Sequence, residues 1–259
     1  MKDMTDKPVI SLLCCGLIGS LVTDGGLIER SFAEAIATQG VVSGTSAFAQ
    51  RMAQVYQARG RGAGDVLAAL FPDNEARAQA AHLAFDRAVA DALGRVVLEP
   101  VPGAIAVLDH LRATGCRVCV VTSLPRRALD LVLVPAGLQP HIDLALSAED
   151  VSRGFPAPDL VLTALMRTRT GAVAEVAVVH GTGAGVESGR RSGAGIVAGV
   201  LTGPHAAARL RAAGATHVLG SIADLPGLLL APPASAIPAA RAEPAIPAQV
   251  PSGRRALGL

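Results

Sequence analysis

The sequence predicts an α/β fold in which a doubly wound parallel sheet carries a helical domain inserted after its first strand. From about residue 100 onward, short apolar runs alternate with helical segments, as in successive βαβ units. A long stretch of helical periodicity separates the first apolar run from the others. The 259-residue chain is 51% hydrophobic and 17% charged, which suits a parallel sheet covered on both faces.

The first strand is expected within the apolar run Val9–Val22. This run is too short to cross a bilayer comfortably, and the charges before it are mixed. Leu13 precedes Cys14, at a place where a lipoprotein signal needs a small residue. We therefore interpret the run as a buried strand, and we expect no membrane association.

The next segment is expected to be helical. The turn Asp24-Gly25-Gly26 opens it, and breaks are expected at Gly60–Gly64 and at Pro72-Asp73. One apolar face at helical spacing is formed by Leu27, Ile28, Phe32, Ala35 and Ile36. The sequence thus predicts a helical cap over residues 25–98.

The remaining chain supplies the rest of the sheet. Strands are expected at 118–121, 142–146, 176–179, 196–201 and 217–219, and helices at 107–112, 126–134, 159–166 and from 187. The core domain then comprises 8–24 and 99–230. Residues 231–259 are rich in Pro and Ala, and we expect them to be a disordered tail.

Composition excludes some classes of partner. The net charge is +2 and Trp is absent, so neither a nucleic acid nor a membrane surface is an expected partner. Cys116 and Cys119 have CxxC spacing, but on a strand they point to opposite faces and share no metal or disulfide. With Cys14 and Cys15, they suit the core of a protein in the reducing cytoplasm.

Four segments resemble the motifs of haloacid dehalogenase (HAD) type phosphatases. They are Gly16–Ser20 after the first strand, Thr122-Ser123 after the second, Gly154–Asp159, and Val178–Gly189. Segments at 24–32, 199–205 and 216–226 resemble the phosphonoacetaldehyde hydrolase-like branch, and the match spans roughly 8 to 228. The resemblance implies a Rossmann-like core with an inserted C1-type cap.

The same resemblance implies an aspartyl-phosphate mechanism that needs magnesium and a cationic clamp for the phosphoryl group. Gly16 stands at the position of the nucleophile and Ile18 at that of the acid/base. Phe155 stands at the position of the cation, and Gly181 and Gly185 at those of the metal-binding acids. The standard mechanism therefore lacks its residues, and we expect neither a metal nor another cofactor.

Some groups that could hold an anion remain. Gly19, Ser20, Thr122, Ser123 and Thr182 could offer hydroxyls and backbone amides to a small phosphorylated ligand.

Neither the missing phosphate-binding cation nor a Schiff-base lysine has an expected substitute. Arg153 lies two residues from Phe155, but its side-chain direction would differ. Ala63 stands where phosphonoacetaldehyde hydrolases carry a Schiff-base lysine, and the cap has no lysine, so imine chemistry is not expected.

A replacement chemistry would need a new nucleophile. The candidates are Cys14, Cys15, Asp24, His180 and His205, among which Cys15 and His180 could form a nucleophilic pair. The alternative is a buried thiol and a histidine that fills vacated space. Asp24 and Glu29 are expected to act structurally near a helix start.

The sequence favours a catalytically inactive HAD homologue, a pseudoenzyme that regulates or scaffolds through a protein partner or a homo-oligomer. One alternative is a divergent hydrolase of small phosphorylated or phosphonate metabolites. Another is a non-catalytic small-anion binder.

Overall fold

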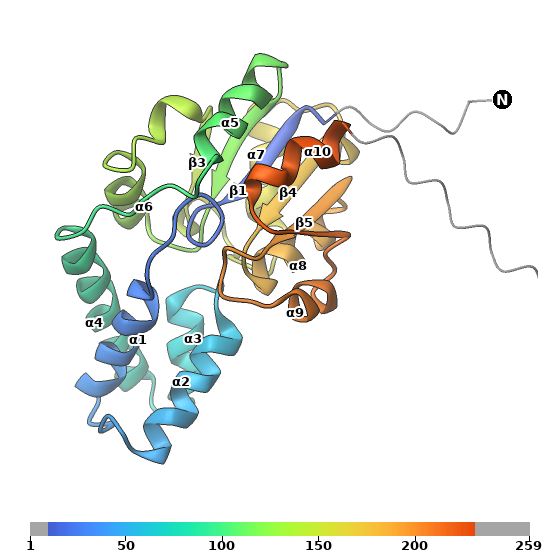
Figure 1. Ribbon diagram of the computed structural model, residues 1–259. Helices are drawn as coiled ribbons and strands as arrows, with labels where there is room; N and C mark the ends of the chain where they lie inside the picture. The colour runs from blue at the N-terminus through green and yellow to red at the C-terminus, as the bar shows by residue number, and fades with distance from the viewer. Residues whose placement is uncertain (1–9, 231–259) are drawn as a thin grey trace, which may run out of the picture.

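The computed structural model describes residues 10–230, so residues 1–9 and the expected tail at 231–259 lie outside the described part. Six strands form one sheet in the order β3-β2-β1-β4-β5-β6, and every neighbouring pair is parallel (Figure 1). The strands are β1 Leu12–Gly16, β2 Arg117–Val121, β3 Leu144–Leu146, β4 Val176–His180, β5 Ile196–Val200 and β6 His217–Leu219. This confirms the predicted fold class.

Helices cover both faces of the sheet. They are α5 Ala104–Ala113, α6 Arg126–Leu133, α7 Asp159–Thr168, α8 Gly183–Ser192, α9 Ala207–Ala212 and α10 Leu225–Leu230. Alternate residues of β1 belong to different core clusters: Leu13 and Cys15 pack with α5 and α6, and Leu12 and Cys14 with α7. The period-2 side-chain alternation of a strand thus builds two cores from one buried run.

The segment after β1 forms four helices, here called the helical insertion: α1 Leu27–Thr38, α2 Ser46–Ala58, α3 Ala63–Leu70 and α4 Glu75–Leu93. Its apolar side chains include Phe32 and Phe85, whose rings are tilted by 36° with centroids 4.3 Å apart, and they belong to the same buried cluster as Leu13 of β1. The side chains of Thr45 and Asn74 cap α2 and α4. The helical insertion stands apart from the sheet as a separate group of helices (Figure 1).

Some elements differ from expectation. The first strand ends at Gly16, because Leu17–Val22 folds into a tight turn in which Leu21 and Val22 donate to the carbonyl of Leu17. Helix α8 begins at Gly183 rather than near 187, because Thr182 caps its first turn. Cys116 and Cys119 lie in different core clusters, as the strand geometry predicted.

Candidate functional site

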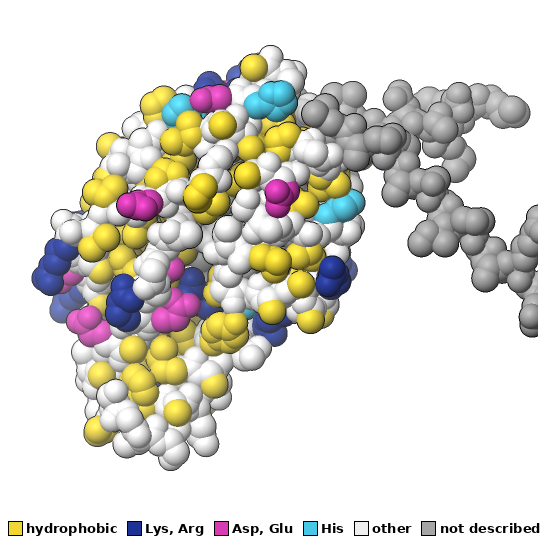
Figure 2. Space-filling view, in the orientation of Figure 1, with side chains coloured by type: hydrophobic (Ala, Val, Ile, Leu, Met, Phe, Trp, Pro, Cys, Tyr) yellow, Lys and Arg dark blue, Asp and Glu magenta, His cyan; other side chains and the backbone are white. Residues whose placement is uncertain are grey.

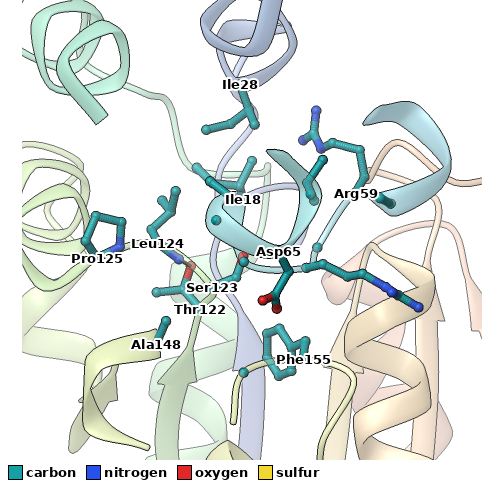
Figure 3. Close-up of a pocket in the computed structure, with 18 of the residues that line it drawn as sticks. Ile18, Ile28, Arg59, Asp65, Thr122, Ser123, Leu124, Pro125, Ala148 and Phe155 are labelled. Carbon is teal, nitrogen blue, oxygen red and sulfur yellow. Dashed lines mark hydrogen bonds between the residues drawn. The ribbon is translucent and has the colours of Figure 1, made fainter. Parts of the chain in front are cut away.

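A cavity of about 320 Å³ lies between the carboxyl edge of the sheet and the helical insertion. Residues after β1, after β2 and at the end of β4 form its floor, and the α2–α3 loop, α3 and α4 form its other wall. Ligands of open α/β sheets bind at this edge. Figure 3 shows Ile18, Thr122, Ser123 and Phe155 around the space.

His180, the last residue of β4, lines this cavity and is 5% exposed. Its Nδ1 lies 3.2 Å from the Thr182 backbone N–H, which donates to it, and 3.0 Å from the Thr182 hydroxyl. Because Nδ1 accepts, the hydrogen-bond network assigns the proton to Nε2. Burial, with a smaller contribution from His205, lowers the pKa of His180 to about 4, so the ring is neutral near pH 7.

Phe155 takes the place at which the HAD resemblance puts a phosphate-binding cation. Its side chain is 2% exposed, and its ring meets that of His180 edge to face with the centroids 5.1 Å apart. Arg153 does not compensate, because its guanidinium binds both carboxylate oxygens of Asp159, at 3.1 and 2.9 Å. That ion pair raises the pKa of Arg153, whose side chain lies largely in solvent.

The imidazole of His180 also fills the space that side chains at two of the glycines would need. A Cβ added at Gly16 would lie 2.8 Å from the Cδ2 and Nε2 atoms of His180. A Cβ at Gly185 would lie 2.1 Å from its Cγ atom. Aspartate at either position therefore requires His180 to move, since such contacts lie well inside van der Waals range.

At the third of these glycines, Gly181, neighbouring backbone atoms leave no space for a side chain. A Cβ at Gly181 would lie 2.3 Å from the carbonyl oxygen of Gly19 and 2.8 Å from the Cα of Gly203. The loops after β1, β4 and β5 thus meet main chain to main chain. A carboxylate at 181 has no room without separating these loops.

The magnesium that the family implies does not fit these residues. Magnesium prefers carboxylate oxygens. The positions expected to supply them are Gly181, where a side chain would meet backbone, and Gly185, where it would meet the His180 ring. Within residues 10–230, no three His, Cys, Asp or Glu side chains are grouped to hold a metal ion.

The residues predicted for anion binding are divided between two places. Thr122, Ser123 and Thr182 line the cavity. Gly19 and Ser20 do not: Gly19 borders a separate depression, and the buried Ser20 hydroxyl accepts the Gly181 N–H at 2.9 Å. Anion binding at these groups stays a prediction.

The pair Cys15 and His180 gains no support as a nucleophilic centre. Cys15 is fully buried among the cluster of Leu13 and Leu17, and it does not line the cavity. Burial, with a smaller contribution from Cys119, raises the pKa of the Cys15 thiol far above its usual range, so the reactive thiolate is suppressed.

The wall of the helical insertion is charged, and the sequence did not single out its buried Arg59. Arg59 is 6% exposed, pairs with the carboxylate of Glu29, and lies 3.8 Å from a carboxylate oxygen of Asp24. Asp24 also accepts the N–H groups of Gly26 and Ile28, so it acts structurally at the start of α1. The other charged residues of the cavity are Arg61, Asp65, Asp86 and Glu149.

Hydrogen bonds join the helical insertion to the core beside the cavity. The Tyr56 hydroxyl donates to the Pro204 carbonyl at 2.6 Å. His205 links the two parts, because its Nδ1 accepts the Gly183 N–H at 2.8 Å and its Nε2 lies 3.1 Å from the Tyr56 carbonyl. A Cβ at Gly60 would lie 2.2 Å from the Thr182 hydroxyl, so the α2–α3 loop rests directly on the start of α8.

Comparison with known proteins agrees with this architecture. A sequence profile of the haloacid dehalogenase-like hydrolases matches residues 18–193. The chain therefore belongs to the haloacid dehalogenase-like hydrolase family. Within it, the chain is similar to the phosphonoacetaldehyde hydrolase-like branch.

The relatives in sequence are phosphonoacetaldehyde hydrolases. That of Bordetella pertussis is 34% identical over 156 residues, covering 51% of this chain and 56% of the relative. That of Salmonella typhimurium is 28% identical over 154 residues, covering 50% and 57%. The chain thus spans about half the length of the curated relatives it matches.

Solved structures share the fold. A phosphonoacetaldehyde hydrolase-like protein from Oleispira antarctica has a TM-score of 0.72 at 23% identity and covers 88% of this chain and 94% of its own. A hydrolase from Pseudomonas syringae has a TM-score of 0.72 at 22% identity, with 84% and 97% covered. In residues 10–230, no helix is long and apolar enough to cross a membrane.

Proposed function

We propose that this chain is a catalytically inactive member of the HAD-like hydrolase family that acts through binding. The observation that carries the proposal is the position of His180. Its neutral ring lies where side chains at Gly16 and Gly185 would project. A nucleophilic carboxylate cannot occupy this centre without rebuilding it, and removing a nucleophile costs on the order of 10⁶ in rate in a well-studied hydrolase.

In this proposal the helical insertion is a cap that encloses a binding cavity, and the chain regulates or scaffolds a protein partner or a second copy of itself. We place it in the cytoplasm, where its four buried free cysteines stay reduced. No cofactor takes part. Size-exclusion chromatography with light scattering, together with partner capture by the full-length chain, tests the association.

A divergent hydrolase is the second candidate, because the matching relatives are phosphonoacetaldehyde hydrolases at up to 34% identity. Steady-state assays on phosphonoacetaldehyde and phosphate monoesters, with magnesium and with a chelator, separate the two candidates. We expect no more product in the presence of the protein than in buffer alone. Magnesium-dependent turnover that His180→Phe abolishes would replace the proposal with the hydrolase.

Reversion to the family motif gives a second test. The variant G16D/F155K/G181D/G185D restores the acids and the cation, yet we expect it to unfold more easily and to stay inactive. His180 obstructs positions 16 and 185, and backbone obstructs position 181. An active, stable revertant would show that the loops adapt and that these positions line a working centre.

A further inference from the structure

A second depression, here called the arginine groove, lies outside the cavity and shares the α2–α3 loop with it. It is bordered by the end of α2 and the loop that follows, by the first turns of α8, and by α9. Figure 1 shows α8 and α9 at the end of the core nearest the helical insertion. None of the positions at which the family motifs are altered borders this groove, so it is a separate place on the molecule.

Two exposed arginines from different parts of the chain border the arginine groove: Arg61 from the α2–α3 loop and Arg209 from α9. The Arg209 guanidinium donates to the Gln57 carbonyl, and a Cβ added at Gly183 would lie 3.8 Å from its Nε. Both of these neighbours also border the groove. The contacts therefore hold the guanidinium at the groove, and they leave most of its five N–H donors available.

The other charged groups of the groove are already paired. Arg59 pairs with the carboxylate of Glu29, and Glu187 pairs with Arg191 at 2.6 Å. Neither Arg61 nor Arg209 takes part in an ion pair within residues 10–230. Two unpaired positive charges thus remain at one concave surface, and they match an anion that carries two negative charges.

The first turn of α8 adds a backbone donor to the same groove. The Gly183 N–H donates to Nδ1 of His205 at 2.8 Å, and the Gly185 N–H donates to the Thr182 hydroxyl at 3.3 Å. The N–H of Ala184 lies between them in sequence, has no intrahelical acceptor, and meets no other acceptor in the described part of the chain. Ala184 borders the groove, so this amide supplements the two guanidinium groups.

We propose that the arginine groove binds the phosphoryl group of a small phosphate monoester. Arg209 and the Ala184 N–H hold its oxygens from the core, and Arg61 contacts it from the helical insertion. A phosphate monoester carries about −1.5 to −2 charges near pH 7, which matches the two unpaired cations. The groove volume of about 420 Å³ lies within the range of small-molecule sites, roughly 300–1,000 Å³. The proposal goes beyond the proposed function, because it assigns a ligand to a site outside the cavity.

Two probes that differ in charge test the proposal. Methyl phosphate is largely a dianion at about pH 7.5, whereas dimethyl phosphate is a monoanion of similar shape. Each is titrated at constant ionic strength into the full-length ¹⁵N-labelled chain. We expect methyl phosphate to shift the signals of the Ala184 amide and of the Arg209 Nε–H in a saturable way. Dimethyl phosphate should bind about tenfold more weakly, as the loss of one charge-assisted contact implies.

Paired variants of α9 locate the site. Arg209→Gln should weaken the binding of methyl phosphate about tenfold. Arg211→Gln removes an exposed arginine of the same helix that does not border the groove, and it should leave the affinity unchanged. Arg61→Gln should also weaken binding, and it tests the proposal from a different element if Arg209→Gln fails to fold.

Equal affinities in Arg209→Gln and Arg211→Gln would overturn the proposal, as would the absence of any saturable shift. Shifts centred on Thr122 and Ser123 would also overturn it, because they would place the anion in the cavity. The turnover assays described above concern the cavity, so the two experiments fail separately. Turnover together with binding that depends on Arg209 would remove the proposed function and keep this site. No turnover and no binding would remove this site alone.

Discussion

The ring of His180 lies against three of the positions at which the motifs are altered, Gly16, Phe155 and Gly185. In the family pattern that Val178–Gly189 resembles, a glycine stands where this chain has His180, and an aspartate follows it. In this chain the His180 ring occupies the space that side chains at Gly16 and Gly185 would take. We therefore expect that restoring the acids alone does not restore the centre.

The packing of Gly185 against His180 gives a first prediction. Alanine has the higher helix propensity, by about 1 kcal/mol, so Gly185→Ala in α8 would be stabilising if space allowed. We expect it instead to lower the free energy of unfolding by about 1–3 kcal/mol through overpacking, as measured by urea denaturation. In a His180→Gly background the same substitution should become neutral or stabilising.

A control glycine isolates this effect. Gly154 also borders the cavity, but an added Cβ there would meet no atom within 4 Å. Gly154→Ala should therefore change stability little in either background. Equal effects of Gly185→Ala with and without His180 would show that the ring does not fill this space.

The burial of His180 predicts a pH dependence of stability. Its pKa falls from 6.5 to about 4 on folding. The contribution of neutral His180 to the free energy of unfolding is complete above about pH 6.5. It is lost as the pH falls toward 4, because only the unfolded state then takes up the proton. This contribution of His180 amounts to about 3 kcal/mol. Burial also lowers the pKa of His205, which therefore acts in the same direction.

Urea denaturation between pH 7 and 5 measures this dependence. The stability of the unmodified chain should fall more steeply than that of His180→Phe, and His217→Phe should keep the steeper slope because His217 is exposed. Parallel curves for the unmodified chain and His180→Phe would mean that His180 is protonated or solvated in the folded state.

At the residue scale, the sequence identified the altered positions and offered a histidine that fills vacated space as one interpretation of His180, but it did not indicate which atoms His180 would contact. Gly16, Phe155, Gly181 and Gly185 were recognisable because the motifs around them persist. The contacts of His180 with Gly16 and Phe155 join segments far apart in the chain, and no local pattern encodes such contacts. The ion pair of Arg59 with Glu29 was missed for the same reason.

At the scale of elements, the helical insertion contacts the core in two ways: α4 packs against α6 within a shared apolar cluster, and polar contacts join the end of α2 to the core beside the cavity. Tyr56, His205 and the close approach of Gly60 to Thr182 all lie near the end of α2.

Removing the Tyr56 hydroxyl tests this attachment. Tyr56→Phe eliminates the 2.6 Å bond to Pro204, and we expect faster hydrogen exchange in residues 58–62 with little change in the sheet. A neutral hydrogen bond contributes about 1 kcal/mol, so the exchange rate in residues 58–62 should increase several-fold. Thr38→Val is the control, because the hydroxyl that it removes donates to the Ala35 carbonyl and accepts from the Gln39 side chain, both within the helical insertion. Unchanged exchange in Tyr56→Phe would show that the bond does not hold the loop.

Most elements followed from periodicity, and their ends did not. The fifth and sixth strands were predicted within a residue, because a short apolar run between polar turns leaves little choice. The run Val9–Val22 was read as a strand, yet Leu17–Val22 forms a turn. Both conformations bury the same apolar side chains, so hydropathy could not distinguish them.

For the whole molecule, the fold and the chemistry separate. The sheet, its connections and the helical insertion follow the HAD pattern, and solved hydrolases share them with TM-scores near 0.72. The surface shows hydrophobic and charged side chains interspersed on the face seen in Figure 2. Fold alone does not fix function, and the function proposed here rests on the cavity floor.

The absence of carboxylates at positions 16, 181 and 185 leads to a prediction about metal. A ligand that binds only the folded state raises the melting temperature. Millimolar magnesium should therefore leave the melting temperature within error of that in EDTA. A concentration-dependent rise with magnesium, absent in a Glu149→Gln or Asp86→Asn variant, would reveal a metal site formed by the cavity's remaining acids.

The most direct test of the account is a single-turnover experiment with phosphonoacetaldehyde, magnesium and the full-length chain in excess over substrate. Excess protein removes slow product release as an explanation for silence and exposes even one chemical event per molecule. The account predicts that substrate disappears no faster than in buffer. Faster loss of substrate that EDTA stops and that His180→Phe abolishes would show that the centre around His180 is catalytic.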